Sequence, residues 1–449
     1  MKGKEGSLNE TPVSERVHIA LFGRTNAGKS SLLNAITGQN AAVVSGIKGT
    51  TTDPVQKAME LQPAGPVVII DTPGLDDDST LGGERVERAG AVLRKTDIAV
   101  IVIDSETGVS ERDNKIAGEI AKRKIPFIIV FNKCDKGKCK SEKAKGETVK
   151  ALDKAEGAKG ETVKAIDKAE GVKGEIIKSV PKGGGAGFDT DNILFVSAKT
   201  GEGIEKLKNT LASLAIRLKS ENDRPLVKDL VKKGGYALLV APIDSAAPKG
   251  RLILPQQQVI RELIDNGSVP IIVNAVQLQS VIDDFGSKIS LIVTDSQAVA
   301  AVYAAAPDEI PLTTFSILFS RYKGELQTQL EGLERIKSLS QGDTVLISEG
   351  CTHHRQCGDI GTVKIPLALK KITGKNIKIE TTSGGEFPKN LAKYKAVIHC
   401  GGCMLNEKEM KYRIDLCREN GVAITNYGMV LSLAAGTLHR CIRALGAEI

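Results

Sequence analysis

The chain has 449 residues, 41% of them hydrophobic and 26% charged, with 62 Lys and Arg against 54 Asp and Glu. This length predicts about three domains, and the apolar content is sufficient for packed cores. Much of the net charge of +8 lies in the lysine-rich residues 136–182, and the near balance elsewhere argues against a broad nucleic-acid-binding surface.

The N-terminus is polar, and no apolar run approaches the length of about 18 residues that a membrane span needs. We therefore expect a cytoplasmic protein with neither a membrane nor a nucleic acid as its partner. In a reducing compartment, the eight cysteines are thiols or metal ligands rather than disulfides.

The first motif is a phosphate-binding loop. A buried strand at residues 17–22 leads into G-x-x-x-x-G-K-S at residues 23–30, followed by a helical pattern. Such a loop presents backbone N–H groups to phosphates at a helix N-terminus, where the dipole also favours anions. We expect Lys29 to reach the β- and γ-phosphates and Ser30 to bind Mg²⁺. The other nucleotide-binding residues expected here are Gly23, Asn26, Gly28 and Ser31.

Three more motifs follow strand ends. Asp71 can hold the Mg²⁺ shell, and Gly74 can sense the γ-phosphate. The carboxylate of Asp135 can accept two hydrogen bonds from guanine, which adenine cannot supply. With the phosphate loop, these motifs predict a GTPase domain that binds GTP or GDP with Mg²⁺. The residues expected around the base are Asn132, Lys133, Asp135, Ser197, Ala198 and Lys199.

This stretch resembles the TrmE–Era–EngA group of translation-factor-like GTPases. Residues 49–53 are similar to the switch I motif of that group, so Thr51 would be a Mg²⁺ ligand, and Thr50 is also expected at the nucleotide. Asn26 matches the asparagine with which potassium-activated members hold K⁺. The backbone of residues 45–50 would complete the K⁺ site, and the ion would supply the charge that an arginine finger supplies elsewhere.

The resemblance leaves the water-positioning residue open. Leu75 stands where such a residue is usual, and the resemblance offers Glu87 instead. Glu87 can equally be an exposed helix acid. We therefore expect slow, K⁺-activated hydrolysis, with Lys29, Thr51, Asn26 and Glu87 as the catalytic candidates.

A charged insert at residues 136–188 separates the last two nucleotide motifs. It contains two nearly identical copies of one repeat, at residues 145–158 and 159–172. Lys, Glu, Ala and Gly dominate both copies, so the repeat can bury little surface alone. It is either a solvated decoration or a partner-binding segment.

Residues 220–308 alternate between strand-like and helix-like patterns, which predicts a small α/β unit. No cluster of catalytic residue types falls at its strand ends. The alanine-rich stretch 297–306 is suited to a core helix or to a subunit interface.

The last segment places cysteines at two strand ends. Apolar runs at residues 343–348 and 395–399 lead to Cys351 and to Cys400 and Cys403. In a parallel sheet, loops after the strands gather at one edge, so these sulfurs are expected to meet there. Three thiolates suit a 4Fe–4S cluster with one iron left for a weaker ligand.

The fourth ligand and the metal remain open from the residues alone. His353 or His399 could complete an iron–sulfur cluster, or neither could. Zinc held by Cys351, His353, Cys400 and Cys403 is chemically acceptable as well. Unligated thiols and imidazoles at the strand ends are the third possibility.

A GTPase of this kind followed by Cys-x-His and His-Cys-x-x-Cys resembles the FeFe-hydrogenase maturation GTPases, the HydF family. The resemblance implies a GTPase domain (10–219), a dimerisation domain (220–308) and a cluster-binding domain (309–449) whose parallel sheet carries the iron–sulfur site. The expected fold is therefore α/β, a P-loop GTPase domain followed by two smaller α/β domains. The insert at 136–188 departs from the family pattern.

The same resemblance implies a function and partners. The protein would be a homodimeric scaffold that receives a diiron precursor from two radical-SAM maturation enzymes and passes it to the FeFe-hydrogenase apoprotein. GTP hydrolysis would act as a conformational switch. The alternative is an RNA-modifying or ribosome-assembly GTPase with a zinc module, for which a basic, aromatic-studded surface would be expected.

Overall fold

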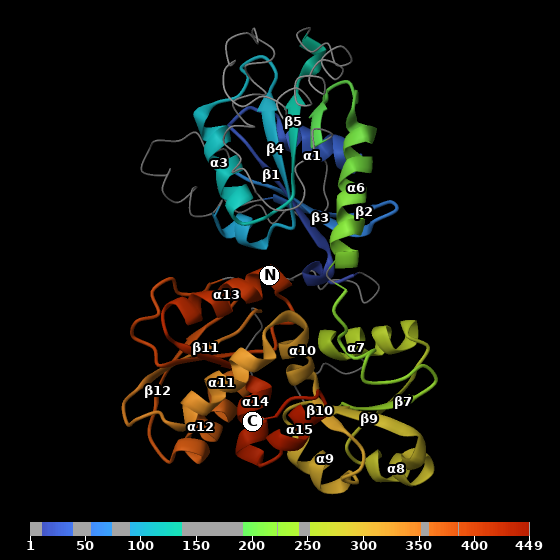
Figure 1. Cartoon of the computed structure of the whole chain (residues 1–449), viewed down its shortest axis with the longest axis vertical. Helices are drawn as coiled ribbons and strands as arrows, with labels where there is room; N and C mark the ends of the chain where they lie inside the picture. The colour runs from blue at the N-terminus through green and yellow to red at the C-terminus, as the bar shows by residue number, and fades with distance from the viewer. Residues whose placement is uncertain are drawn as a thin grey trace, which may run out of the picture. The chain divides into compact units, whose positions relative to one another are not determined.

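The structure is a computed structural model that describes residues 11–38, 55–73, 90–136, 192–221, 223–241, 252–351, 359–384 and 386–448. The chain divides into two compact units, Met1–Asp223 and Arg224–Ile449. Strands and helices alternate in both units (Figure 1), which confirms the predicted α/β class. Within the described ranges, no helix is both long enough and apolar enough to cross a membrane.

The first unit is built on a six-stranded sheet with the order β2-β3-β1-β4-β5-β6. β2 runs antiparallel to β3, and the other pairs are parallel. The elements described in this unit are η1 (Val13–Glu15), β1 (Val17–Phe22), α1 (Lys29–Thr37), β2 (Val55–Leu61), β3 (Gly65–Asp71), β4 (Ile98–Asp104), α3 (Glu111–Lys122), β5 (Phe127–Asn132), η2 (Cys134–Lys136), β6 (Ile193–Phe195) and α6 (Ile204–Glu221).

Helices cover both faces of this sheet, which is why its central strands are apolar throughout. Successive side chains of β1 point to opposite faces. Ile19 and Leu21 pack in the cluster that includes α1 and α6, whereas Ala20 and Phe22 pack in the cluster that includes α3. Figure 1 shows α3 on one side of the strands and α1 and α6 on the other. The strand ends that carry the nucleotide motifs are therefore held by two cores.

The second unit contains two four-stranded parallel sheets. The middle sheet has the order β10-β9-β7-β8, and the C-terminal sheet has the order β12-β11-β13-β14. Its elements are β7 (Tyr236–Val240), α7 (Leu254–Asp265), β8 (Val269–Val273), α8 (Leu278–Phe285), η4 (Gly286–Lys288), β9 (Ile289–Thr294), α9 (Val299–Ala305), β10 (Leu312–Thr314), α10 (Phe315–Lys323), α11 (Leu326–Lys337), β11 (Thr344–Ser348), η5 (Ile360–Lys364), α12 (Ile365–Thr373), β12 (Lys378–Thr382), β13 (Ala396–His399), α13 (Glu407–Glu419), β14 (Ala423–Asn426), α14 (Tyr427–Ala435) and α15 (Leu438–Arg443).

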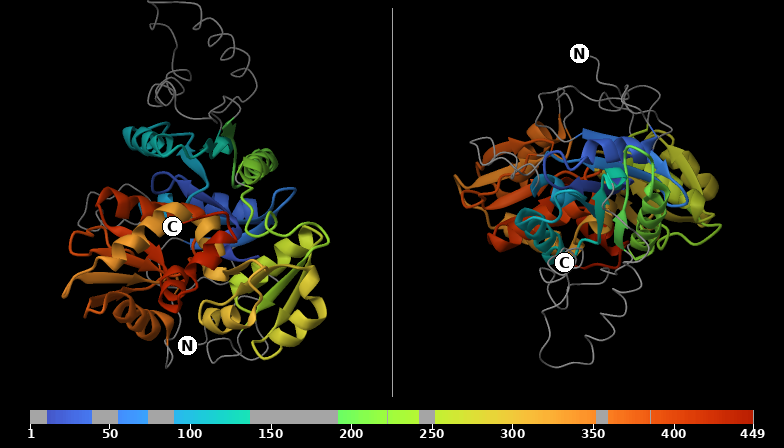
Figure 2. Two further views of the ribbon diagram at one scale, coloured as in Figure 1. Left: turned by 60° about the horizontal axis from the view of Figure 1, so that its bottom comes forward. Right: turned by 90° about the horizontal axis from the view of Figure 1, so that it is seen from above.

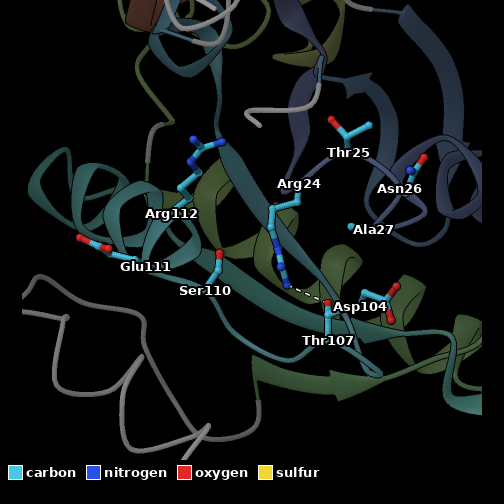
Figure 3. A pocket seen from close by; sticks show the side chains of 9 residues that line it. All are labelled: Arg24, Thr25, Asn26, Ala27, Asp104, Thr107, Ser110, Glu111 and Arg112. Atoms are coloured by element: carbon cyan, nitrogen blue, oxygen red, sulfur yellow. Dashed lines mark hydrogen bonds between the residues drawn. The ribbon is translucent and has the colours of Figure 1, made fainter. Parts of the chain in front are cut away.

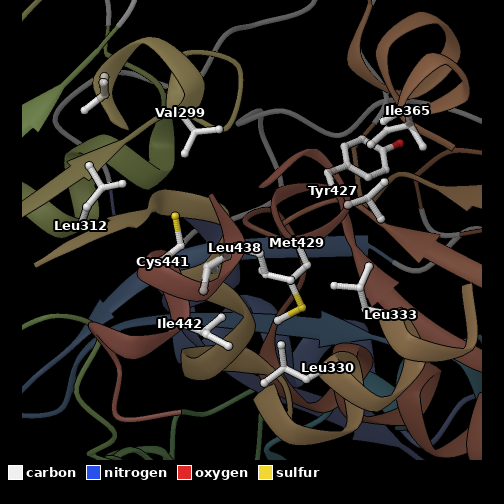
Figure 4. Close-up of a cluster of buried hydrophobic side chains, with 14 of the residues drawn as sticks. Val299, Leu312, Leu330, Leu333, Ile365, Tyr427, Met429, Leu438, Cys441 and Ile442 are labelled. Atoms are coloured by element: carbon white, nitrogen blue, oxygen red, sulfur yellow. The ribbon is translucent and has the colours of Figure 1, made fainter. Parts of the chain in front are cut away.

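The two sheets of this unit share one hydrophobic core. A single cluster of buried side chains joins Val299 and Leu312 of the middle sheet region to Leu333 of the C-terminal region. Met429 and Ile442, from the last two helices, lie between them (Figure 4). Figure 2 shows the yellow segment with β7 to β9 beside the orange and red segment with β11 to β14. The unit is therefore one packed body.

Arg440 of α15 reinforces this shared core with hydrogen bonds. Its guanidinium is buried and donates to the carbonyl oxygens of Ala306 (3.1 Å) and Ile310 (2.9 Å), which precede β10. Hydrogen bonds from a charged donor are roughly twice as strong as neutral ones. These bonds hold α15 against the segment that leads into β10 of the middle sheet.

Two details differ from the simplest sequence expectation. The sequence pattern of residues 428–445 predicts one helix. The structure has two, α14 and α15, because Gly436 between them adopts φ +73° and ends the first one. The short strand β10 at residues 312–314 pairs with β9 in the middle sheet, beyond the expected boundary at residue 308. The domain limits at 219 and 308 stay predictions. The repeat insert lies outside the described residues.

We predict that Gly332→Ala destabilises the second unit by about 1–3 kcal/mol. A Cβ at this position in α11 would lie 2.0 Å from the carbonyl oxygen of Ile424 in β14. Gly118→Ala in α3 is the matched control, because its Cβ would meet no atom within 4 Å. That change should stabilise the chain by roughly 0.5–1 kcal/mol. Urea unfolding followed by circular dichroism measures both, and equal effects would contradict the packing described for α11.

Candidate functional site

The phosphate-binding loop connects β1 to α1 and is shaped by two close backbone approaches. Gly28 has φ +89°, and a Cβ there would lie 2.3 Å from Nδ2 of Asn132. A Cβ on Gly23 would lie 2.2 Å from the carbonyl oxygen of Val102. Lys29 is buried, and its Nζ donates to the carbonyl oxygens of Gly23 (2.9 Å) and Arg24 (2.7 Å). Close packing of the two glycines and the contacts of Lys29 therefore fold the loop tightly around the start of α1.

Ser30 and Asp71, the two described residues expected at Mg²⁺, lie together. Ser30 Oγ donates to Oδ2 of Asp71 at 2.5 Å. The other carboxylate oxygen of Asp71 is buried and makes no hydrogen bond. Burial raises the pKa of Asp71, since the charged carboxylate loses its water there. A divalent cation would supply both the missing partner and the missing charge, so this pair fits Mg²⁺.

The base-binding motifs line a cavity of about 230 Å³ at the ends of β5 and β6. Asp135 Oδ1 accepts a hydrogen bond from Ser197 Oγ at 2.7 Å, and this bond holds the pKa of Asp135 below its usual value. Asn132 is buried and connects two loops, donating to the carbonyl of Ala27 (3.1 Å) and accepting from the backbone N–H of Ala198 (3.0 Å). The cavity is lined by Gly28, Ser31, Asn132, Lys133, Asp135, Lys136, Ala198 and Lys199.

Lys133 joins the base motif to the phosphate loop. Its Nζ donates to the carbonyl oxygen of Asn26 and to Oδ2 of Asp104, each at 2.7 Å. Asn26 itself has φ +63°, a conformation that Asn tolerates better than most residues. The backbone of Asn26 is thereby tied to the base motif.

A larger cavity of about 520 Å³ lies beside the phosphate loop (Figure 3). Arg24 crosses it, with Nη2 donating to Thr107 Oγ1 at 2.9 Å and Nε lying 3.4 Å from Oδ2 of Asp113. The start of α3 closes its other side. Sequence motifs do not predict this cavity, because among its lining residues only Arg24, Asn26 and their neighbours belong to a motif. Its lining is Arg24, Thr25, Asn26, Ala27, Asp104, Thr107, Ser110, Glu111 and Arg112.

Some expected site residues lie outside the part of the chain that the structure describes. They are Thr50, Thr51, Gly74, Glu87 and His353.

Three cysteines lie at one edge of the C-terminal sheet. β11 and β13 are parallel neighbours with Ser348 paired to His399, so the loops that follow them leave the sheet side by side. The backbone N–H of Cys400 donates to the carbonyl of Ser348 at 2.9 Å. We call this place, with Cys351, Cys400 and Cys403, the cysteine edge. As predicted, separate chain segments bring soft donors to a common edge.

Burial dominates the electrostatics of these thiols. It raises the pKa of Cys351 to about 12, and neighbouring Cys400 and Cys403 add to the rise. Burial, followed by the effect of Cys400, raises the pKa of Cys403 to about 11. The Sγ of Cys400 accepts backbone N–H bonds from Gly350 (3.1 Å) and Gly402 (3.4 Å). As thiolates, these sulfurs would repel one another, which adds to the rise in their pKa values. A cation bound between them would attract the thiolates and lower those pKa values.

The cysteine edge is not a finished metal cage. Among the described residues, no group of three or more His, Cys, Asp and Glu side chains could hold a metal ion as it stands. The donor types nevertheless fit a thiolate-bound cluster or zinc, because soft sulfur ligands prefer these metals. Metal binding would have to draw the sulfurs together.

His399 is fully buried, and both of its ring nitrogens have partners. Nδ1 lies 2.8 Å from the carbonyl oxygen of Cys400, and Nε2 lies 3.0 Å from Nη1 of Arg413. Burial and then Arg413 lower the pKa of His399 to about 3, so the ring is neutral. The tentative assignment of His399 as an iron ligand would require breaking one of these contacts. The geometry favours a supporting role for the ring.

The sequence motifs do not identify two buried cationic side chains beside the cysteine edge. Arg413 of α13 has no exposed surface, and Lys323 at the end of α10 donates to the carbonyl oxygens of Cys403 (3.2 Å) and Leu405 (2.9 Å). Both look like ordinary charged residues of amphipathic helices. The signal that could have found Arg413 is its i,i+4 spacing from Glu409 on the apolar face of the helix.

Family models match most of the chain. Residues 226–324 match the hydrogen maturase F dimerization domain, and residues 327–444 match the hydrogen maturase F tetramerization domain. This chain belongs to the hydrogen maturase F family. The resemblance stated from the sequence is therefore confirmed. Residues 18–133 of this hydrogen maturase F chain match a 50S ribosome-binding GTPase.

The curated relatives are GTPases that match part of the hydrogen maturase F chain. GTPase Der of Kosmotoga olearia is 29% identical over 248 residues, which are 54% of this chain and 48% of that protein. GTPase Der of Microcystis aeruginosa is 41% identical over 131 residues, or 28% of each chain. The chain thus spans less than half the length of these relatives.

Part of the chain is also similar to two solved structures. Era of Aquifex aeolicus is 24% identical, with a TM-score of 0.31, and the match covers 44% of this chain and 56% of Era. The G domain of the T. maritima FeoB iron transporter is 24% identical, with a TM-score of 0.29, covering 44% of this chain and 99% of that one.

We predict that Asp135→Asn weakens GTP binding by about 10- to 100-fold, because a charged acceptor for guanine is lost. Glu106→Gln is the control, since Glu106 is exposed, pairs with Lys136 and does not line the base cavity. Calorimetric titration with GTP measures both. Equal affinities for the two variants would remove Asp135 from the base site.

Proposed function

We propose that this hydrogen maturase F chain is a GTP-hydrolysing scaffold that carries a 4Fe–4S cluster and delivers the diiron precursor of the FeFe-hydrogenase active site. The observation that carries the proposal is the cysteine edge, at which Cys351, Cys400 and Cys403 leave neighbouring parallel strands. Family membership supplies the link to hydrogenase maturation. In this proposal the diiron precursor is transferred to the hydrogenase, whereas the 4Fe–4S cluster stays bound to this chain.

The residues of the cysteine edge fit an iron–sulfur cluster chemically. Three thiolates would hold three irons and leave the fourth open to a guest ligand. Backbone N–H groups of Gly350 and Gly402 already donate to Cys400 Sγ, and such bonds tune the potential of bound clusters. Bound there, the cluster would supply Lewis acidity and an exchangeable coordination position.

The nucleotide site supports a switch. The P-loop, Ser30, Asp71 and Asp135 give the parts that hold a guanine nucleotide and Mg²⁺. Hydrolysis of GTP would release segments that the γ-phosphate and Mg²⁺ order. GTP chemistry does not itself build a metal cluster, so its role is the timing of docking or release.

The dimerization and tetramerization names of the matched models support a homo-oligomer of this chain, a dimer at least. We place the hydrogenase apoprotein and two radical-SAM maturation enzymes among its partners. The description of the GTPase match, which names 50S ribosome binding, supports a second candidate, a ribosome-assembly GTPase with a zinc module at the cysteine edge.

The cluster prediction is tested by single replacements. Anaerobically reconstituted protein should be brown with about four irons per chain. Cys351→Ala, Cys400→Ala and Cys403→Ala should each lose most of this iron and the ability to activate the hydrogenase. Cys417→Ala is the matched control, because Cys417 lies on the buried face of α13, away from the cysteine edge, and its loss should leave the iron content unchanged.

Iron analysis and visible absorbance measure the result, and hydrogenase activation is assayed with the apoprotein and the two maturation enzymes. Undiminished iron and activation in all three variants would exclude the scaffold. Colourless protein that binds zinc would favour the ribosome-assembly candidate instead.

The potassium prediction concerns Asn26. Replacing Na⁺ by K⁺ should raise GTP turnover by roughly tenfold or more, since the ion adds positive charge at the transferred phosphate. Asn26→Gly should abolish the difference, and glycine accommodates the φ of +63° found at this position. GDP affinity should stay unchanged in the variant. Equal turnover of the unmodified protein in both salts would refute the potassium site.

A further inference from the structure

Arg413 is the most deeply buried charged residue near the cysteine edge. It lies on α13 (Glu407–Glu419) with no exposed surface, and its Nε donates to Oε1 of Glu409 at 3.1 Å. Its guanidinium also stacks against Phe387, 5.0 Å from the ring centroid. A buried charge is costly unless its donors are satisfied by well-placed partners. The hydrogen-bond partners of Arg413 therefore indicate its structural role.

Those partners are the ends of three strands. Nη1 donates to Ser348 Oγ (3.4 Å) at the end of β11 and contacts His399 Nε2 (3.0 Å) at the end of β13. Nη2 donates to the carbonyl oxygen of Gly384 (3.1 Å), in the loop after β12. One planar guanidinium thus connects the ends of β11 and β13 with the loop after β12. Only arginine offers this many donors in a fixed plane.

Each of these partners holds a cysteine in turn. The N–H of Gly384 donates to the carbonyl of Cys351 at 3.2 Å. The backbone carbonyl of Ser348 accepts the N–H of Cys400, and His399 contacts the carbonyl of Cys400 through Nδ1. The guanidinium therefore contacts residues that in turn bond to both cysteine-bearing loops.

The chemistry of arginine also fixes the state of His399. Arg413 has no lone pair to offer, so His399 Nε2 must be the acceptor in their contact. Nδ1 then carries the proton and donates to the carbonyl of Cys400. The ring is locked as the Nδ1–H tautomer, and neither nitrogen faces a metal.

We propose that Arg413 is the positioning residue of the cysteine edge. It aligns the loops that carry Cys351 and Cys400, locks the His399 tautomer, and directs positive charge toward the thiolates so that a bound cluster is reduced more easily. This inference rests on the proposed cluster binding.

Two variants separate position from charge. Arg413→Lys keeps the charge but loses the fork, so it should lose iron to a chelator about 10- to 100-fold faster than the unmodified protein. Arg413→Gln combined with Glu409→Gln removes the buried pair together, which avoids leaving one carboxylate alone. In that variant the ratio of reduced to oxidised cluster at a fixed potential should fall about tenfold, which is about 59 mV for one electron.

An exposed ion pair between the same helix and the start of α11 provides the matched control. Arg418 pairs with Glu325, and its side chain is 51% exposed. Arg418→Gln combined with Glu325→Gln should leave both iron release and potential within about twofold of the unmodified protein. Circular dichroism and GTP turnover confirm that each variant is folded.

Nitrogen chemical shifts of His399 in the iron-free protein give a readout that does not depend on loading. They should report the Nδ1–H tautomer in the unmodified protein and a mixture in Arg413→Lys. If the double variant fails to fold, the chelator and tautomer measurements on Arg413→Lys decide the matter.

Two negative results are distinguishable. If the unmodified protein binds no iron, the proposed cluster binding is refuted, and the role inferred for Arg413 is refuted with it. If it binds iron but both Arg413 variants match the Arg418 control in iron release, potential and tautomer, only the positioning role of Arg413 is overturned.

Discussion

The parallel pairing of β11 with β13 is the constraint on which the cysteine edge depends. It sets Ser348 opposite His399, so that Cys351 and Cys400 start from the same end of the sheet. A one-residue slip would turn every side chain of a strand to the other face. The apolar side chains of both strands are buried in shared cores, and this burial fixes the register. Hydrophobic packing therefore determines where the two cysteine-bearing loops leave the sheet.

In the first unit, buried strands likewise determine where the loops of the expected nucleotide site lie. Its motifs sit at the ends of buried strands, and a few polar side chains tie the separate loops together. Asn132 connects the phosphate loop to the loop of Ala198, and Lys133 connects it to Asp104. These contacts hold the loops that carry the expected nucleotide residues at fixed distances from one another.

Sequence reasoning found the parts that local patterns encode. Lys29 and Asp135 belong to short motifs whose spacing is set by a single loop, and Cys400 and Cys403 follow an apolar strand directly. The break at Gly436 was missed because an apolar stretch on both sides hides it. Arg413 was missed because its partners, Ser348 and Gly384, are distant in sequence and come near only through the sheet. The role of His399 depends on that same long-range contact.

The common core of the middle and C-terminal sheets has a mechanical consequence. Met429 and Ile442 fill the space between the sheets, and Arg440 bonds across them, so no joint lies between the dimerization segment and the sulfur-bearing segment. In any assembly formed through this unit, the distance between the cysteine edges of neighbouring copies is then set by the subunit contact alone. Changing that distance would require a rearrangement of the contact between the copies or a break in the shared core.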